Sequence, residues 1–168
     1  MMHLIIDGYN LIRQSPDLQR LDARELEAGR LELLNRLAAY RGRASHKITV
    51  VFDGWQGGDL KEARDRHLGL LIIYSRLGER ADEVIKRLLA SEKERAVVVS
   101  SDRELQECAR RVGAAWIAAD RFDREHLSAA SPSSSEGDEE EGGRRVKKGP
   151  SRRLPKQVRK LKQRLKKL

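Results

Sequence analysis

Four aspartates occupy positions from which their carboxylates could act on one ligand: Asp7, Asp53, Asp82 and Asp102. Asp7 and Asp53 each end an apolar run and precede a glycine, Asp102 follows a third apolar run, and Asp82 opens a helical pattern. Carboxylates packed together raise one another's pKa unless a divalent cation neutralises them. Ligand sets made only of oxygen suit Mg²⁺ or Mn²⁺, and neither the four histidines nor the single cysteine has zinc-ligand spacing. These residue types therefore predict a Mg²⁺ or Mn²⁺ site.

Each aspartate also has a simpler explanation. An acid at a helix start, such as Asp82 or Asp102, interacts favourably with the helix dipole, by up to about 1 kcal/mol. Asp53 with Gly54 could form an ordinary turn. Asp7 is different, because turn chemistry does not account for an acid at the end of so apolar a strand, where an unpaired charge is costly. Taken together, the four acids favour a metal site.

The elements that must position these aspartates alternate between strand and helix. Apolar runs predict strands at residues 2–7, 47–54, 70–75, 96–100 and 114–120, and helical patterns lie at about 22–42, 81–94, 101–112 and 122–127. Such alternation is typical of a three-layer α/β/α sandwich with a mostly parallel, doubly wound central sheet. The first strand is expected to be central and buried on both faces. Because parallel strands end at one edge of a sheet, the aspartates should converge there.

Local signals place the turns and the helix starts. Gly8 and Asn10 predict a turn after the first strand. The first helix is expected only from Asp22, with Glu25 completing a capping-box-like pair, and a second such box lies at 101–104.

The polar, glycine-containing stretch 55–66 is expected to be a loop with some helix. In it, Trp55 and either Arg64 or Arg66 could contact bases near the acidic edge. Trp116, inside an apolar strand, is expected to belong to the core.

The positive charge of the chain is concentrated at one end. The formal net charge is +9, but residues 1–135 hold 22 Lys and Arg against 21 Asp and Glu. Residues 136–141 hold five acids, and residues 142–168 hold 13 bases and no acid. Such a run predicts contact with a polyanion, most often nucleic acid.

Composition divides the chain into a domain at 1–127, a disordered linker at 128–153 and a basic amphipathic helix at 154–168. The helix carries an apolar seam at Leu154, Val158, Leu161, Leu165 and Leu168. Besides contacts with RNA phosphates, this tail could be a solvated extension or a membrane-surface helix, although its apolar face lacks an aromatic residue.

The remaining compositional signals concern the compartment. The start of the chain has no secretory signal pattern, no apolar run reaches membrane-spanning length, and a single cysteine excludes an intramolecular disulfide. A soluble, cytoplasmic protein without a membrane partner is expected.

Four motifs, in this order and spacing, carry a resemblance: IIDGYNLI, VVFDG, ADEVI and VVVSSDREL. Over residues 1–127 they resemble the NYN domains of the PIN-like nuclease superfamily, in particular the YacP-like branch, whose members include ribosome-associated endoribonucleases. The resemblance implies a Rossmann-like sandwich with an acidic metal site that cleaves RNA, including mRNA on the ribosome.

The resemblance also assigns roles by matching positions. Asp7, Asp82 and Asp102 match the metal-binding core, Asp53 is a further acidic member, and Asn10 matches the asparagine of the DGYN motif, which contacts a phosphate or a metal ligand. One or two metal ions would activate a water molecule for in-line attack on the phosphate. Participation of Glu83, Ser100 and Ser101 in the site remains open, as do the RNA target, the partner of the tail (ribosome, free RNA or a second copy) and the oligomeric state.

Other enzyme classes lack their motifs. No G-x-G-x-x-G or P-loop sequence follows the first strand, and Tyr9 stands where an Asp-x-Asp phosphatase needs its second acid. The rival hypothesis is a non-catalytic RNA- or ribosome-binding adaptor with the same fold. Metal-dependent cleavage of RNA separates the two.

Overall fold

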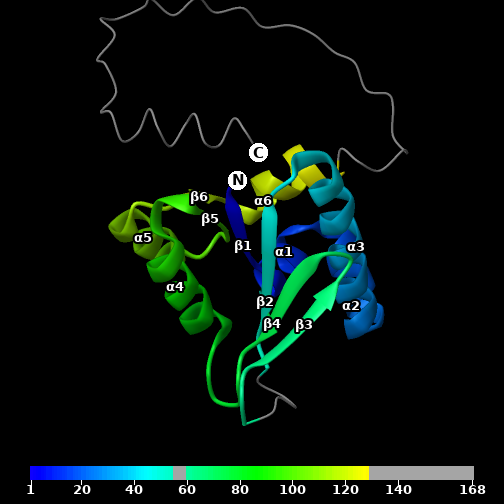
Figure 1. Cartoon of the computed structure of the whole chain (residues 1–168). Coiled ribbons are helices and arrows are strands. Elements are labelled where there is room, and N and C mark those ends of the chain that lie inside the picture. Colours follow the sequence, from blue (N-terminus) through cyan, green and yellow to red (C-terminus); the bar gives the residue numbers. More distant parts are fainter. Residues whose placement is uncertain (55–59, 129–168) are drawn as a thin grey trace, which may run out of the picture. The chain divides into compact units, whose positions relative to one another are not determined.

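The computed structural model describes residues 1–54 and 60–128, within which the elements form one sheet with helices on both faces (Figure 1). The strands are β1 (His3–Asp7), β2 (Lys47–Phe52), β3 (Ala63–His67), β4 (Leu70–Tyr74), β5 (Ala96–Val99) and β6 (Ala115–Ile117). The helices are α1 (Gly8–Gln14), α2 (Pro16–Arg24), α3 (Leu26–Ala44), α4 (Ala81–Glu92), η1 (Lys93–Arg95), α5 (Arg103–Val112), α6 (Ala119–Phe122) and the π-helix η2 (Asp123–Leu127). None of the helices in these ranges has the length and apolar character that crossing a membrane needs.

The strand order is β3-β4-β2-β1-β5-β6, and every pairing is parallel except that of β3 with β4. β1 lies between β2 and β5, and all five of its residues are buried. Such a strand has no solvent-facing side, which explains its almost continuous apolar sequence. The predicted three-layer α/β/α fold with a central first strand is therefore confirmed.

The two helical layers differ in the part of the chain that builds them. α4 and α5 pack on one face of the sheet, whereas α1, α2, α3 and α6 cover the other (Figure 1). Beneath α4, Ile5, Val51 and Ile73 meet Ile85 and Leu89 in a buried cluster. The partly buried Trp116 packs against this cluster, as expected of a core residue.

The turn predicted after β1 is wrong, because α1 begins directly at Gly8. A Cβ at position 8 would lie 2.3 Å from the ring of Phe52. Only glycine lets the helix start so close to β2. The first strand therefore passes its last residue, Asp7, straight into a helix N-terminus.

The first long helix also begins earlier than predicted. Pro16 opens α2, where its missing N–H costs no hydrogen bond, so Asp22 lies inside a helix and does not cap one. Glu25, which is extended at φ −154° and ψ 117°, separates α2 from α3 and makes no side-chain cap. The last helical segment likewise starts at Ala119, before the predicted residue 122.

The stretch predicted as loop contains the edge strand β3, although its residues are partly or fully exposed. Arg64 and Arg66 belong to this strand. Its strand conformation comes from antiparallel pairing with β4, and charged residues are typical of such edges. Trp55, the predicted linker at 128–153, except its first residue, and the predicted basic helix at 154–168 lie outside the described residues.

Candidate active site at the carboxyl edge of the sheet

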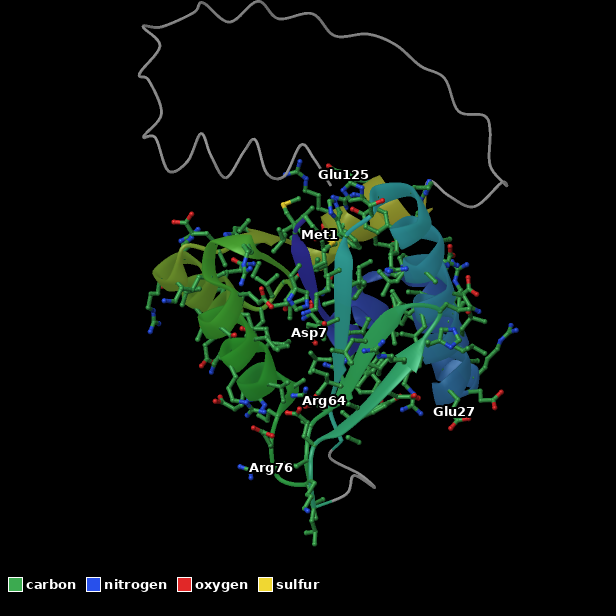
Figure 2. The ribbon with its side chains drawn as sticks, in the orientation of Figure 1. Met1, Asp7, Glu27, Arg64, Arg76 and Glu125 are labelled. Atoms are coloured by element: carbon green, nitrogen blue, oxygen red, sulfur yellow. The ribbon has the colours of Figure 1, made fainter. Side chains whose placement is uncertain are left out.

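Asp7 is the centre of the candidate site, at the carboxyl end of β1 (Figure 2). Its side chain is buried, with a relative exposure of 8%. Oδ2 accepts a hydrogen bond of 3.1 Å from the hydroxyl of Ser100, and Oδ1 accepts a long one of 3.4 Å from the backbone N–H of Asn10. Asp7 therefore serves as the N-cap of α1 as well.

Burial raises the pKa of Asp7 to about 6, and the hydrogen bonds from Ser100 and Asn10 only partly oppose this effect. The charges of Asp82 and Asp53 contribute to the same rise of the pKa. A carboxylate held in this way is short of positive charge, which a bound cation would supply.

Asp53 follows β2 and reaches the start of α4, where its Oδ1 accepts a hydrogen bond of 2.5 Å from the backbone N–H of Ala81. The residue in the N-cap position of α4, Arg80, makes no side-chain cap. Asp53 thus caps a helix that is remote in sequence, and the simple turn considered for Asp53 and Gly54 does not describe its contacts.

Asp82 lies in the first turn of α4, with its side chain 15% exposed. Burial raises its pKa, Arg80 opposes this shift, and the charges of Asp102 and Asp53 add to it. The contact with Arg80 is long, at 3.7 Å between Nη2 and Oδ2. Asp82 is therefore partly buried, close to other acids and only loosely held.

Asp102 is the N-cap of α5. Its Oδ1 accepts hydrogen bonds from the backbone N–H groups of Glu104, at 2.7 Å, and Leu105, at 3.4 Å. Asp102 thus lies at a helix start, as considered, and also caps the helix, whereas the predicted capping by Ser101 is wrong. Ser101 Oγ instead accepts a hydrogen bond of 3.1 Å from the N–H of Ala119, because its side chain turns toward the segment after β6.

Two polar residues join the loops around these acids. The Ser100 hydroxyl donates to Asp7 and accepts from the N–H of Asp102 at 3.1 Å. The side-chain oxygen of Asn10 accepts from the N–H of Ser101 at 2.9 Å. Both side chains therefore tie the loop after β5 to the end of β1. Glu83 is exposed and pairs with Lys86 at 2.9 Å.

The acids influence one another, but in this conformation they do not enclose an ion. Asp7 is affected by Asp82 and Asp53, and Asp82 by Asp53 and Asp102. Within residues 1–54 and 60–128, no three His, Cys, Asp or Glu side chains are grouped so that they could hold a metal ion. One oxygen of Asp53 and one of Asp102 are taken up by helix N–H groups. The donor types suit Mg²⁺ or Mn²⁺.

Sequence reasoning missed Ser75 and Arg80. Ser75 is buried directly after β4, where its hydroxyl donates to the carbonyl of Glu79 at 2.7 Å and accepts from the N–H of Gly54 at 3.0 Å. It therefore fixes the segment that precedes α4. Arg80 had a signal in the sequence, since arginine is an unfavourable residue directly before a helix.

The family comparison covers almost the whole chain. The sequence profile of the YacP-like NYN domain matches residues 4–167, so it continues through the basic tail, beyond the segment 1–127 that carries the motifs. In Bacillus subtilis (strain 168), the uncharacterized protein YacP is 33% identical over 85 residues. That alignment spans 51% of this chain and only about half, 49%, of the relative.

Solved structures agree with this match. The crystal structure of Rae1 (YacP) from Bacillus subtilis is similar with a TM-score of 0.62 and 30% identity, over 76% of this chain and 75% of that one. A point mutant of the same protein gives a TM-score of 0.64 and 27% identity, over 76% of both chains. The chain belongs to the YacP-like NYN domain family, within the PIN-like nuclease superfamily.

Proposed function

We propose that this protein is a divalent-metal-dependent endoribonuclease that hydrolyses phosphodiester bonds of RNA at the carboxyl edge of its sheet. The observation that carries the proposal is Asp7, a buried carboxylate at the end of the central strand whose pKa is raised to about 6 by burial and by neighbouring carboxylates. Acids gathered around a buried acid disfavour its charged form and do not help the fold, so this arrangement favours a functional role. Membership of a nuclease superfamily supports phosphodiester hydrolysis as the reaction of this site.

The proposed ligands for Mg²⁺ or Mn²⁺ are Asp7, Asp53, Asp82 and Asp102. When bound, such an ion neutralises the carboxylates, acidifies a water molecule and stabilises the departing oxygen. Asp7 has both oxygens oriented, by the hydroxyl of Ser100 and the N–H of Asn10. Asp53 and Asp102 are oriented by N–H groups of α4 and α5, which bind Oδ1 of each residue. In this proposal, Oδ2 of each residue would bind the cation.

Asn10 and Ser100 support the acids in this proposal. Each uses its side chain to join the loop after β5 to the end of β1, which keeps Asp102 near Asp7. A direct contact of Ser100 with a phosphate would compete with its bond to Asp7. We therefore give Ser100 a positioning role.

The proposed substrate is RNA, including mRNA presented on the ribosome, as the motif resemblance implies. The described domain contributes little net charge, whereas residues 142–168 carry 13 bases and no acid. This tail would supply affinity for RNA phosphates that weakens as salt rises. A non-catalytic RNA- or ribosome-binding adaptor is the alternative, and the surplus of acids at the sheet edge argues against it.

The test compares wild type with Asp7→Asn on labelled single-stranded RNA and on ribosome-bound message, with Mn²⁺ or with chelator. Asp17→Asn is the matched control, because it removes the same charge from an exposed position on α2. We expect cleavage by wild type and Asp17→Asn only with metal, and a loss on the order of 10³-fold in Asp7→Asn.

Cleavage by Asp7→Asn at the wild-type rate, or undiminished cleavage in chelator, would contradict the nuclease proposal. Tight, salt-sensitive binding without cleavage of either RNA would favour the adaptor.

A further inference from the structure

Arg80 occupies a helix N-cap, a position where arginine is unfavourable. It occupies the N-cap of α4, with φ −84° and ψ 152°, and makes no side-chain cap. Ser, Thr, Asp and Asn are favoured there, and a cation lies unfavourably at the positive end of the helix dipole. Asp53 supplies the missing cap through Ala81. A residue that breaks a local rule in this way calls for a functional explanation.

The backbone on both sides of Arg80 is anchored. The carbonyl of Glu79 accepts from the buried Ser75 hydroxyl at 2.7 Å, and the Glu79 carboxylate pairs with Arg87. On the other side, the N–H of Ala81 donates to Asp53 at 2.5 Å. The base of the Arg80 side chain is thus fixed beside two of the proposed metal ligands.

The guanidinium of Arg80 is, in contrast, almost unused. The side chain is 73% exposed, and its contact with Asp82 at 3.7 Å is too long for a hydrogen bond. Among the described residues this is its one ion pair. Arg87 differs, because both of its terminal nitrogens bind carboxylates, those of Glu79 and Glu62. A single exposed ion pair contributes little free energy, so the guanidinium can exchange this partner for another anion.

We propose that Arg80 binds a nonbridging oxygen of the scissile phosphate and leaves Asp82 when RNA enters the site; this inference rests on the proposed nuclease function. A guanidinium donates paired, charge-assisted hydrogen bonds to phosphate oxygens. Its fixed base places it at the acidic edge, where it offsets repulsion between the acids and the phosphate. Its departure also releases the Asp82 carboxylate for a cation.

The experiment uses the full chain and three variants. Arg80→Ser removes the guanidinium and installs a favoured N-cap residue, so the start of α4 should not be harmed. Arg80→Lys keeps the charge without the planar fork. Arg76→Ser is the control, because Arg76 is 62% exposed in the same segment and its ion pair, at 3.5 Å, is with Glu79 instead of a site acid.

With Mn²⁺, we expect Arg80→Ser to slow single-turnover cleavage on the order of 10²-fold, with Arg80→Lys intermediate and Arg76→Ser close to wild type. The melting temperature of Arg80→Ser should equal or exceed that of wild type. In chelator, the slope of log affinity for single-stranded RNA against log salt should become shallower by about 0.7, as for one lost phosphate contact.

Three results would overturn the inference: cleavage by Arg80→Ser at the wild-type rate, an equal loss in Arg76→Ser, or slower cleavage with an unchanged salt slope. The last result would mean that Arg80 acts only by positioning Asp82. A wild type that binds RNA without cleaving it would refute the proposed function, and the salt slope would still test the phosphate contact. If the wild type neither binds nor cleaves RNA, both proposals fail.

Discussion

His3 and Asp7 lie at opposite ends of β1, both buried, yet their surroundings differ in charge balance. His3 Nε2 lies 2.7 Å from the Thr49 hydroxyl oxygen, and Nδ1 lies 3.1 Å from the carboxylate of Glu92. Glu92 also faces two cations, Lys47 and Arg95, each at 3.6 Å. At the amino end of the strand, therefore, the carboxylate beside the buried side chain is offset by nearby cations.

At the carboxyl end, acids outnumber bases. Asp7 has two hydrogen-bond donors but is affected by the charges of Asp82 and Asp53. The cations that act on Asp82 are the loosely held Arg80 and Lys86. The difference teaches that burial of a polar group does not by itself indicate function. A buried group whose charge is offset by its neighbours is accounted for by the fold, whereas an excess of like charge around a buried group favours a functional role.

The two ends should respond to pH with opposite sign. Burial, with help from Lys47, lowers the pKa of His3 from 6.5, so the folded protein loses stability as the pH falls below about 6.5. The pKa of Asp7 is raised from 3.8 to about 6, so the folded protein holds this proton more tightly and loses stability as the pH rises between those values.

The largest expected effect on stability is that of Asp7→Asn in chelator. A rise of the pKa from 3.8 to about 6 corresponds to at most about 3 kcal/mol. Asp7→Asn should therefore be more stable than wild type near pH 8, by up to about that amount, and the difference should disappear near pH 4. Urea unfolding across this pH range measures the effect.

Two further variants serve as controls for this pH series. Asp17→Asn is the matched control, because it removes one negative charge from an exposed position. His3→Gln should lessen the loss of stability below about pH 6.5, because its side chain does not titrate. Equal stability of Asp7→Asn and wild type throughout would mean that the acids at the carboxyl edge are already compensated.

A smaller effect is expected from Thr49→Val at the amino end. Thr49 is fully buried, and the nearly isosteric valine leaves His3 Nε2 without its partner. The expected cost is about 1–3 kcal/mol, with cleavage of RNA by the folded protein unchanged. A double-mutant cycle with His3→Leu measures the coupling between the two side chains. Absence of coupling would show that the contact of His3 with Thr49 contributes no stability, and a loss of cleavage would show that the two ends are not separate in function.

The smallest effect should come from Lys86→Gln, which removes an ion pair between α4 and α5. Lys86 pairs with Glu83 of its own helix at 2.9 Å and joins α4 to α5 through a contact of 2.5 Å to Glu104. The carboxylates of both pairs are exposed to solvent, so loss of the pairs should lower the free energy of unfolding by less than about 1 kcal/mol. Thermal unfolding of Lys86→Gln and Glu104→Gln measures this cost. A loss of stability as large as that of Thr49→Val would show that exposed ion pairs contribute as much as a buried hydrogen bond.

The sequence by itself determined the strands of the parallel sheet and the positions of the four aspartates. Runs such as 47–52 and 96–99 are mostly apolar because these strands are covered on both faces, so their burial can be predicted from their residue types. The stripe at Val84, Ile85 and Leu89 likewise fixed α4. Since parallel strands end at one edge, the acids at these ends could be placed together before any contact was known.

The tertiary structure decided the contacts that give those residues their properties. Position 8 must be glycine where α1 begins because Phe52 leaves no room for a side chain there, and β3 is a strand because β4 pairs with it. The bonds of Asp53 to Ala81 and of Asn10 to Ser101 join residues far apart in the chain. Periodicity records which face of an element is buried, but not which distant atom it meets. The raised pKa of Asp7 and the loose contact of Arg80 with Asp82 depend on contacts between distant residues, so only the folded chain reveals them.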